Sequence, residues 1–359
     1  MLNTTPDIPA FATAITHWQQ AQGRHHLPWQ GTNDAYRIWL SEIMLQQTQV
    51  DTVIGYYTRF LERFPNLQSL AQASLDDVMP FWAGLGYYTR ARNLHRCAVQ
   101  VMEHWNGQFP DQAEQIATLP GIGRSTAAAI AAFAHGRRSP ILDGNVKRVF
   151  CRYFGIHGNT QLSAIDKKLW ALAEQIVEQA PDTLNMAAYT QGLMDLGATR
   201  CTRSRPQCAA CPLQNRCHAH ATNTQSELPT PRQRKTLPER DCALLVIHLS
   251  SGILLEKQPS PGIWGGLWSL PRFDTADALK TACLNLGYHR EPVRLAGLQH
   301  VFSHFRLNID PWYLHLPDTL PLQETQPHQC WMPTARLETT ALPTPIRKIL
   351  GVVQAGTLV

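Results

Sequence analysis

The sequence lacks both the basic, apolar start of a secretory signal and an apolar run long enough to cross a membrane. Its first twenty residues read MLNTTPDIPAFATAITHWQQ, and no later apolar run approaches the roughly 20 residues that a spanning helix needs. We therefore expect a cytoplasmic protein. Nine cysteines are an odd number in a chain without an export signal, which argues against a disulfide framework and favours metal binding.

The sequence has only a small excess of positive charge. The 32 Lys and Arg residues exceed the 27 Asp and Glu residues to give a formal net charge of +5. This excess suits a nucleic-acid partner without requiring one, so an ordinary soluble enzyme stays open. At 359 residues the chain is longer than one usual domain, and two units with separate cores are expected.

The residue pattern changes from helix-forming to strand-forming at a polar, proline-containing segment near residue 230. Helix-forming stretches continue from residue 34 to about 213, whereas 243–259 has the pattern of a β-hairpin. A helix near 275–286 and a strand-like segment over 300–316 follow. We predict a multidomain α+β fold: an all-α domain over 1–224, a linker over 225–240 and a small α/β domain over 241–359.

Four cysteines at the end of the helical part have metal-ligand spacing. They form C-x6-C-x2-C-x5-C, short enough for one loop to surround a single centre: Cys201, Cys208, Cys211 and Cys217. Both a [4Fe-4S] cluster and a structural zinc accept four thiolates, so the spacing alone leaves these two open. The other five cysteines are scattered and are expected to be buried thiols.

A glycine hairpin precedes an alanine-rich helical run. In LPGIG, residues 119–123, Gly121 and Gly123 permit backbone conformations that direct N–H groups and the following helix N-terminus towards an anion. This predicts a sequence-independent clamp for a DNA phosphate. A plain turn between two helices is the alternative.

Two carboxylates lie in contrasting surroundings. Glu42 falls within the apolar run IWLSEIMLQQTQV, where partial desolvation favours the protonated acid. Asp143 precedes an expected helix and is placed as its N-cap, which favours the ionised form. Such a pair suits cleavage of a glycosidic bond. A solvent-facing Glu and a purely structural cap are the alternatives, and the sequence does not show that the two are neighbours.

Six motifs in this order resemble the MutY family of adenine DNA glycosylases, over about residues 15–359. They are the four-cysteine loop and, before it, LPWQ (27–30), SEIMLQQTQV (41–50), GLGYYTRARNLH (84–95), LPGIGRSTA (119–127) and LDGNVKRV (142–149). The resemblance implies a helix-hairpin-helix glycosylase domain with a [4Fe-4S] cluster. It also implies a nucleoid-associated monomer that acts on double-stranded DNA with A:8-oxoguanine or A:G mispairs.

The same resemblance assigns roles to single residues. Glu42 would protonate adenine at N7, Asp143 would stabilise the sugar cation, and Asn145 would orient groups nearby. Ser125 occupies the hairpin region where bifunctional relatives carry a Schiff-base lysine, so strand cleavage by such a lysine is not expected. Lys147 is expected to contact a phosphate or to be solvated.

An enzyme that reaches a base inside a duplex must extrude it and fill the gap in the stack. By resemblance, Gln47 inserts near the extruded adenine and Tyr87 stacks beside the oxidised guanine. Without the resemblance, Tyr87 reads as a core aromatic residue.

The C-terminal part resembles the Nudix fold, with GIWGGLWSLPRF over 262–273. Nudix hydrolases hold magnesium with glutamates, and alignment on Gly287 places Thr281, Leu284 and Asn285 at the acidic positions. Pyrophosphate hydrolysis is therefore not expected. The resemblance instead implies 8-oxoguanine recognition by a loop that contains Phe302, Ser303 and His304.

Three other functions remain as alternatives. An endonuclease III-like pyrimidine glycosylase with lyase activity is disfavoured by Ser125 and by the extra domain. A non-catalytic lesion-binding protein would not need Glu42. A Nudix nucleotide hydrolase is disfavoured by the missing glutamates.

Overall fold

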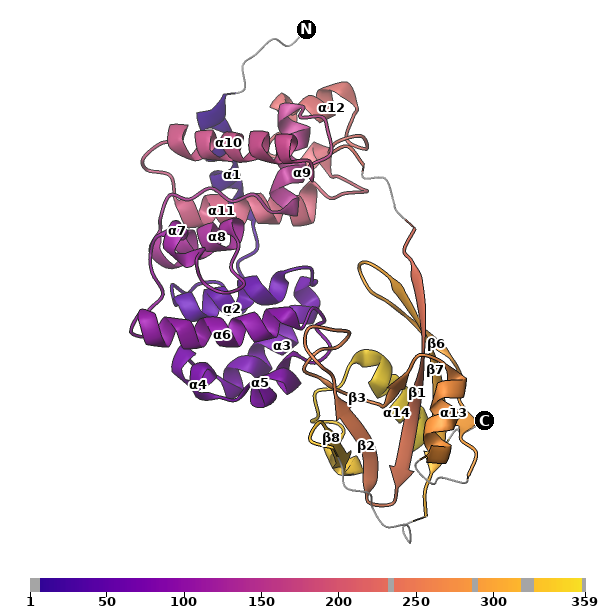
Figure 1. The fold of residues 1–359 in the computed structure, drawn as a ribbon. Helices are drawn as coiled ribbons and strands as arrows, with labels where there is room; N and C mark the ends of the chain where they lie inside the picture. The colour runs from indigo at the N-terminus through magenta and orange to yellow at the C-terminus, as the bar shows by residue number, and fades with distance from the viewer. Residues whose placement is uncertain (1–6, 232–235, 286–289, 318–325, 357–359) are drawn as a thin grey trace. The chain divides into compact units, whose positions relative to one another are not determined.

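The computed structural model describes residues 7–231, 236–285, 290–317 and 326–356. The chain divides into two compact units, one formed by 1–72 and 92–233 and the other by 73–91 and 234–359 (Figure 1). No signal in the sequence indicates that 73–91 belongs with the C-terminal strands. The domain limits 1–224, 225–240 and 241–359 stay a prediction. No helix within the described residues has the length and apolar character to span a membrane.

The first unit is helical, as its sequence predicts. A π-helical turn, Leu196–Arg200, continues the last long helix, and short 3-10 turns at Cys208–Ala210 and Gln214–Arg216 follow in the cysteine loop. The α-helices are α1 (Ile8–Gln22), α2 (Ala35–Leu45), α3 (Val50–Arg63), α4 (Leu67–Gln72), α6 (Thr89–His104, which starts in the other unit), α7 (Ala113–Ile116), α8 (Arg124–His135), α9 (Gly144–Phe154), α10 (Ser163–Gln179), α11 (Met186–Asp195) and α12 (His218–Thr222).

Side chains at the helix starts fix where α2, α9 and α11 begin. Asp34, Asp143 and Asn185 each accept N–H bonds from the first turn of the helix that follows. Behind these starts lies an apolar core that α1, α9 and α11 share, with Phe11, Phe150 and other large side chains. The caps and the core together hold the N-terminus of α9 in place.

The second unit is built on a mixed sheet in which β1 and β7 run parallel and the strand order is β3-β2-β1-β7-β5. The helices of this unit are α5 (Leu75–Trp82), α13 (Ala276–Asn285) and α14 (Thr344–Gln354). Its strands are β1 (Glu239–Leu249), β2 (Gly252–Lys257), β3 (Trp268–Ser269), β4 (Arg272–Phe273), β5 (Val293–Arg294), β6 (Leu298–Val301), β7 (Arg306–His315) and β8 (Gln329–Met332).

The predicted α/β character and the hairpin at 243–259 are confirmed, and α13 falls within the predicted helix at 275–286. The strand-like segment 300–316 is instead the end of β6, a turn and β7. Phe302 donates its N–H to the carbonyl of Phe305 at 2.9 Å, which reverses the chain. Gly287, on which the Nudix alignment rests, lies outside the described residues.

The β1–β2 hairpin depends on Gly252. Its φ is 159°, and a Cβ there would collide with the carbonyl oxygen of Met332 on β8. We expect Gly252→Ala to lower the free energy of unfolding by about 1–3 kcal/mol, because backbone atoms would have to move apart. Calorimetric unfolding measures this, with Gly351→Ala as control, since a Cβ at Gly351 meets nothing within 4 Å. Equal melting temperatures for the two variants would contradict the packing argument.

Candidate active site

Glu42 lies on the third turn of α2, among neighbours that exclude most solvent. Its backbone neighbours Ser41 and Ile43 are buried, while the carboxyl side chain itself keeps part of its surface open. Burial and, to a lesser extent, the negative charge of Asp143 together raise the pKa of Glu42 to about 8. The predicted desolvation of this acid is confirmed, and its carboxyl is mostly protonated at neutral pH.

Asp143 is the N-cap of α9, as the sequence predicts. Its Oδ1 accepts the N–H of Val146 at 2.8 Å, and its Oδ2 accepts the side-chain amide of Asn145 at 3.2 Å. The prediction that these bonds hold its pKa down is wrong in net direction. Burial raises the pKa of Asp143 above its ordinary value, and the hydrogen bonds lower it by less. The bonds still favour the ionised form, whereas no hydrogen bond to a described residue does so at Glu42.

A cavity of about 770 Å³ brings the predicted residues of the first unit together. Its lining comes from the end of α2, the starts of α8 and α9 and the π-helical turn. The site residues that line it are Glu42, Gln47, Ser125, Asp143 and Asn145. Lys147 is not among the lining residues, and its ammonium pairs with Asp166 at 2.5 Å. The two carboxylates, 101 positions apart in the chain by subtraction of their numbers, thus face one space.

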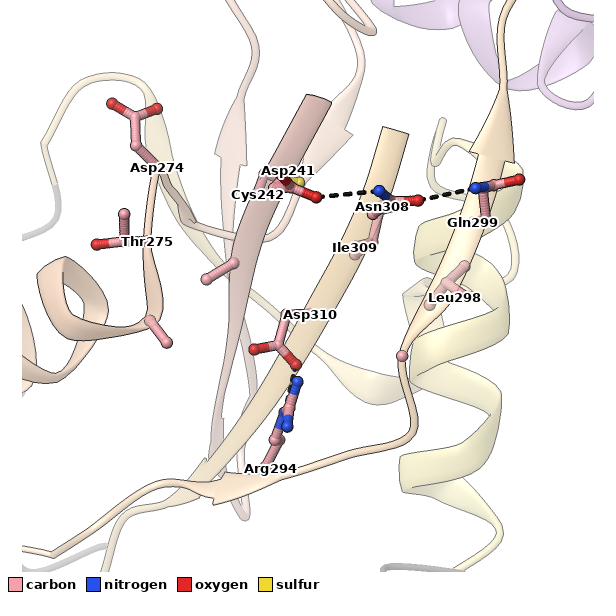
Figure 2. A pocket seen from close by; sticks show the side chains of 13 residues that line it. Asp241, Cys242, Asp274, Thr275, Arg294, Leu298, Gln299, Asn308, Ile309 and Asp310 are labelled. Atoms are coloured by element: carbon pink, nitrogen blue, oxygen red, sulfur yellow. Dashed lines mark hydrogen bonds and ion pairs between the residues drawn. The ribbon is translucent and has the colours of Figure 1, made fainter. Parts of the chain in front are cut away.

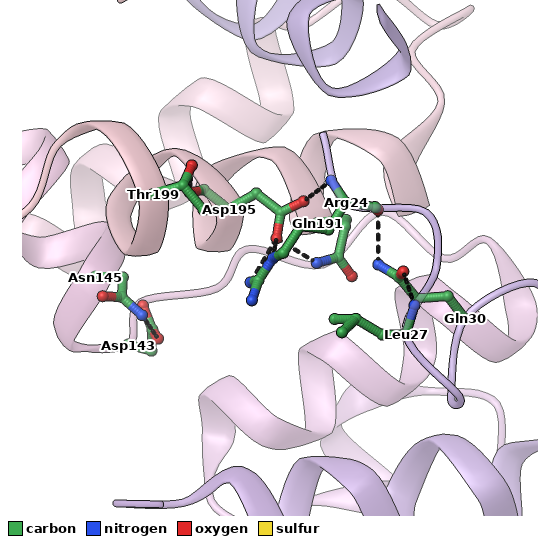
Figure 3. A network of polar contacts seen from close by, with 8 residues as sticks. All are labelled: Arg24, Leu27, Gln30, Asp143, Asn145, Gln191, Asp195 and Thr199. Carbon is green, nitrogen blue, oxygen red and sulfur yellow. Dashed lines mark hydrogen bonds and ion pairs between the residues drawn. The ribbon is translucent and has the colours of Figure 1, made fainter. Parts of the chain in front are cut away.

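A second cavity, of about 610 Å³, is also lined by Glu42, together with residues of α1, α11 and the loop between α1 and α2. Arg24 lines both cavities. Its guanidinium and its N–H bind Asp195, a fully buried carboxylate at 2.6–2.8 Å, which also accepts the amide of Gln191 at 2.8 Å (Figure 3). Glu42 therefore lines two spaces that are rich in hydrogen-bonding groups.

Asn145 connects Asp143 to the π-helical turn and the cysteine loop. The side-chain oxygen of Asn145 accepts a hydrogen bond from Arg148 at 2.8 Å. Arg148 also donates to the backbone carbonyls of Gly197 and Cys201 at 2.7 and 2.8 Å. Gly197 permits this contact, because a Cβ there would lie 2.5 Å from the Cβ of Asn145. The start of α9 is consequently locked against the turn that leads to the cysteines.

The glycine hairpin has the predicted geometry. Gly121 adopts φ 78°, and a Cβ there would lie 2.7 Å from the Cβ of Asn93 on α6. Gly123 is the N-cap of α8, so no side chain caps the first amides of this helix. Ser125 accepts the N–H of Leu142 at 3.0 Å and so ties the hairpin to the segment that carries Asp143. Phosphate binding by this hairpin stays a prediction.

Gln47 and Tyr87 share an unusual backbone conformation. Their φ angles are 58° and 48°, values that non-glycine residues rarely adopt. Both side chains are exposed, and Tyr87 keeps 46% of its surface accessible. Tyr87 is therefore not a core aromatic residue. Strain of this kind is maintained where the surroundings impose it and occurs often at functional sites.

Comparison with known proteins identifies the family. Residues 40–175 match the family model for the HhH-GPD superfamily of base excision DNA repair proteins, and 242–351 match a NUDIX domain. The chain is 37% identical to the adenine DNA glycosylase of Buchnera aphidicola subsp. Schizaphis graminum over 96% of this chain and 99% of that protein. It is 33% identical to the human adenine DNA glycosylase over 97% of this chain and 74% of the human protein.

The chain belongs to the adenine DNA glycosylase family. It is thus a DNA glycosylase of the base excision repair superfamily, as the sequence motifs predict. Among solved structures, a thermostable thymine-DNA glycosylase matches with a TM-score of 0.53 and 28% identity over 60% of this chain and 97% of that one. An endonuclease III in complex with DNA has a TM-score of 0.51 and 18% identity over 62% of this chain and all of that one, which shows the shared fold.

In this family member the four cysteines of the loop lie close enough to interact. Burial raises the pKa of Cys211 to about 12, and the charges of Cys201, Cys217 and Cys208 add to that rise. Buried Arg152 donates to the sulfur of Cys201 at 3.4 Å, and Gln225 donates to that of Cys208 at 3.8 Å. Yet no three His, Cys, Asp or Glu side chains of the described segments could hold a single metal ion.

A third cavity, of about 600 Å³, lies in the second unit beside β1, β6 and β7 (Figure 2). Asp310 binds Arg294 at 2.7 Å and accepts the indole N–H of Trp312 at 3.0 Å. Asp241 accepts the amide of Asn308 at 3.0 Å. These two carboxylates are occupied by protein donors that join β1, β5 and β7.

The predicted recognition residues of the second unit lie in the turn between β6 and β7. Ser303 and His304 are exposed at its tip, and Phe302 is half-buried and stacks on Phe305. A role for them in recognition stays a prediction.

Sequence reasoning missed Arg24, Gln191 and Arg148. Arg24 and Asp195 are 171 positions apart, so no spacing pattern relates them. Arg148 is part of the motif LDGNVKRV, and its place in that motif was the one signal that could have identified it.

The raised pKa of Glu42 predicts a pH-dependent stability difference. Between about pH 4.5 and 8 the folded protein keeps a proton that the unfolded chain has released, so this group destabilises the fold progressively as pH rises. We expect the melting temperature of Glu42→Gln minus that of wild type to increase from pH 5 to pH 8. Glu62→Gln, at an exposed position on α3, is the control. A pH-independent difference would contradict the raised pKa.

Proposed function

We propose that the protein is a monofunctional adenine DNA glycosylase that removes adenine paired with 8-oxoguanine or guanine by hydrolysing the N-glycosidic bond. The observation that carries this proposal is that Glu42 and Asp143 line one cavity although they come from different helices. The adenine DNA glycosylases that match nearly the whole chain support the choice of base. The net charge of +5 suits a DNA partner, and we propose that the protein acts as a monomer in the cytoplasm, at the nucleoid.

The two carboxylates divide the chemistry. Glu42, with a pKa of about 8, holds a proton at neutral pH and gives it to adenine N7, which makes the base a better leaving group. Asp143 accepts hydrogen bonds from Val146 and Asn145, which favour its anion, and that anion stabilises the cationic sugar until water attacks. Burial, together with the negative charge of Asp143, keeps Glu42 protonated.

The second cavity supplies a place for the base. Because Glu42 lines both cavities, a purine in the cavity beside Gln191 and Arg24 would present its ring nitrogen to the acid. The sugar would then remain in the cavity with Asp143. Amide and guanidinium groups match the donors and acceptors of a purine edge. A base can reach this position only when it is extruded from the duplex.

Contacts to the rest of the DNA follow from the other predicted residues. Gly121, Gly123 and the uncapped start of α8 bind a phosphate. Gln47 fills the gap left by the extruded adenine, and Tyr87 stacks beside the opposite base. Both side chains are exposed on backbones held in a left-handed conformation, a kind of strain that occurs often at functional sites, which supports this role. Phe302, Ser303 and His304 recognise 8-oxoguanine.

The surroundings of Ser125 and Lys147 support base release without strand cleavage. Ser125 offers a hydroxyl where bifunctional relatives carry a lysine, and the ammonium of Lys147 is paired with Asp166 outside the cavity. A Schiff base requires a free amine next to the sugar. A pyrimidine glycosylase with lyase activity, the second candidate, has the fold similarity to endonuclease III in its favour.

A panel of duplexes tests the function. We expect free adenine from A:8-oxoguanine and A:G duplexes, with strand scission only after alkali. Glu42→Gln and Asp143→Asn should each lower the single-turnover rate by at least about 100-fold, in line with the usual contribution of an acid catalyst. Release of an oxidised pyrimidine with spontaneous nicking would support the second candidate. Unchanged adenine release by Glu42→Gln would show that Glu42 is not the acid.

We further propose that Cys201, Cys208, Cys211 and Cys217 hold a [4Fe-4S] cluster. Four thiolates can hold either a tetrahedral zinc or a [4Fe-4S] cluster. The resemblance of the C-x6-C-x2-C-x5-C loop to that of the MutY family, and the place of the chain in the adenine DNA glycosylase family, support the cluster. When bound, the cluster would fix this loop against Arg148 and α9.

The cluster proposal predicts a visible absorption band. Purified protein should absorb at about 400 nm. It should also contain about four iron atoms for each chain, as a [4Fe-4S] cluster requires. Cys211→Ser should lose the band, whereas Cys97→Ser, at a buried cysteine outside the loop, should retain it. One zinc for each chain and no band would contradict the proposal.

A further inference from the structure

The turn between β6 and β7 rests on a pair of stacked rings. Phe302 and Phe305 have ring centroids 4.5 Å apart and planes inclined by only 18°, and the Phe302 N–H closes the turn on the Phe305 carbonyl. Ser303 and His304, between them, are exposed. The conformation of these two polar side chains therefore depends on how the ring pair is held.

One part of the support lies against Phe302. The ring of His300 meets it edge-on at 4.6 Å, and the ring of Trp264 lies 6.2 Å away. Trp264 is buried and has a φ of 56°, so its backbone is held in a conformation that bulky residues rarely adopt. This support thus combines the half-buried ring of His300 with the buried ring of Trp264.

The other part lies against Phe305, whose ring is buried, and includes one exposed cation. The guanidinium of Arg240, at the start of β1, lies over the ring of Phe305 at 4.7 Å from its centroid. Within the described residues the Arg240 side chain makes no ion pair or hydrogen bond, although neighbouring Glu239 pairs with Arg306. A planar guanidinium stacks on an aromatic face better than an ammonium does. The ring is thus the partner that orients Arg240, and Arg240 restrains the ring.

We propose that Arg240 is a positioning residue that determines specificity for the base opposite the excised adenine. By stacking on Phe305 it holds the ring pair, and through it the turn, in the conformation that presents Ser303 and His304 to 8-oxoguanine. The proposal rests on the proposed function, because it acts on the recognition step of that reaction. It assigns Arg240 an effect on lesion preference and none on the carboxylates of the first unit.

The test is the ratio of single-turnover adenine release from A:8-oxoguanine and A:G duplexes. A cation–π contact at an exposed site corresponds to an equilibrium factor of about two to five, so Arg240→Gln should lower the ratio by about that much. Lys280→Gln is the matched control, since Lys280 also lies over an aromatic ring, that of Trp312 at 5.0 Å, and carries the same charge. We expect this control to leave the ratio unchanged.

A double-mutant cycle shows whether Arg240 acts through Phe305. Phe305→Leu should lower the ratio, and adding Arg240→Gln in that background should lower it no further. An equal loss in both backgrounds, or an unchanged ratio in Arg240→Gln, would overturn the proposal. If Phe305→Leu does not fold, Arg240→Met decides: it keeps a long side chain and loses the cation, so a full wild-type ratio would overturn the proposal.

The controls separate this proposal from the proposed function. If wild type released adenine equally from both duplexes, the lesion specificity itself would be wrong, and the Arg240 proposal with it. If wild type prefers A:8-oxoguanine and Arg240→Gln does so equally, only the Arg240 proposal fails.

Discussion

The enforced proximity of two carboxylates in a poorly solvated space is the constraint on which the site depends. Burial alone raises the pKa of each group above its ordinary value, and the negative charge of Asp143 adds to the rise at Glu42. Burial disfavours charge at both positions, and the negative charge of Asp143 further disfavours ionisation of Glu42, so we expect the two protons to be lost at different pH values. Hydrogen bonds at Asp143 and their absence at Glu42 among the described residues then decide which group keeps the proton.

The surrounding structure serves to maintain that arrangement. The capping bonds at Asp143 belong to α9, whose start is held by Asn145, Arg148 and the turn at Gly197. Arg148 donates to the backbone carbonyl of Cys201, so a displacement of the cysteine loop would also disturb the capping bonds at Asp143. The half-buried Arg24 pairs with the fully buried Asp195 and so fixes the loop before α2, the helix that carries Glu42. Removing one partner of such a pair commonly costs several kcal/mol, because the other charge is left buried.

Sequence patterns predicted local features well. The helix starts at Asp34 and Asp143, the hairpin at Gly252 and the turn at Gly121 follow from residue types whose conformational preferences act over a few positions. The predicted lowering of the Asp143 pKa was wrong. Capping can be predicted from neighbouring residues, whereas the burial that raises this pKa depends on segments far apart in the chain. Arg24, Gln191 and the second cavity arise from helices far apart in the chain, and no local signal contains them. The left-handed conformations of Gln47 and Tyr87 could not be predicted from the sequence either, since neither residue type favours them.

The central claim is that Glu42 is protonated near neutral pH because of its burial beside Asp143. The most direct measurement is the carboxyl carbon-13 shift of Glu42 as a function of pH, assigned by its absence in Glu42→Gln. The account predicts a midpoint near 8 that moves downward in Asp143→Asn. A midpoint close to the ordinary value of 4.5 for a Glu, unaffected by Asp143→Asn, would contradict it.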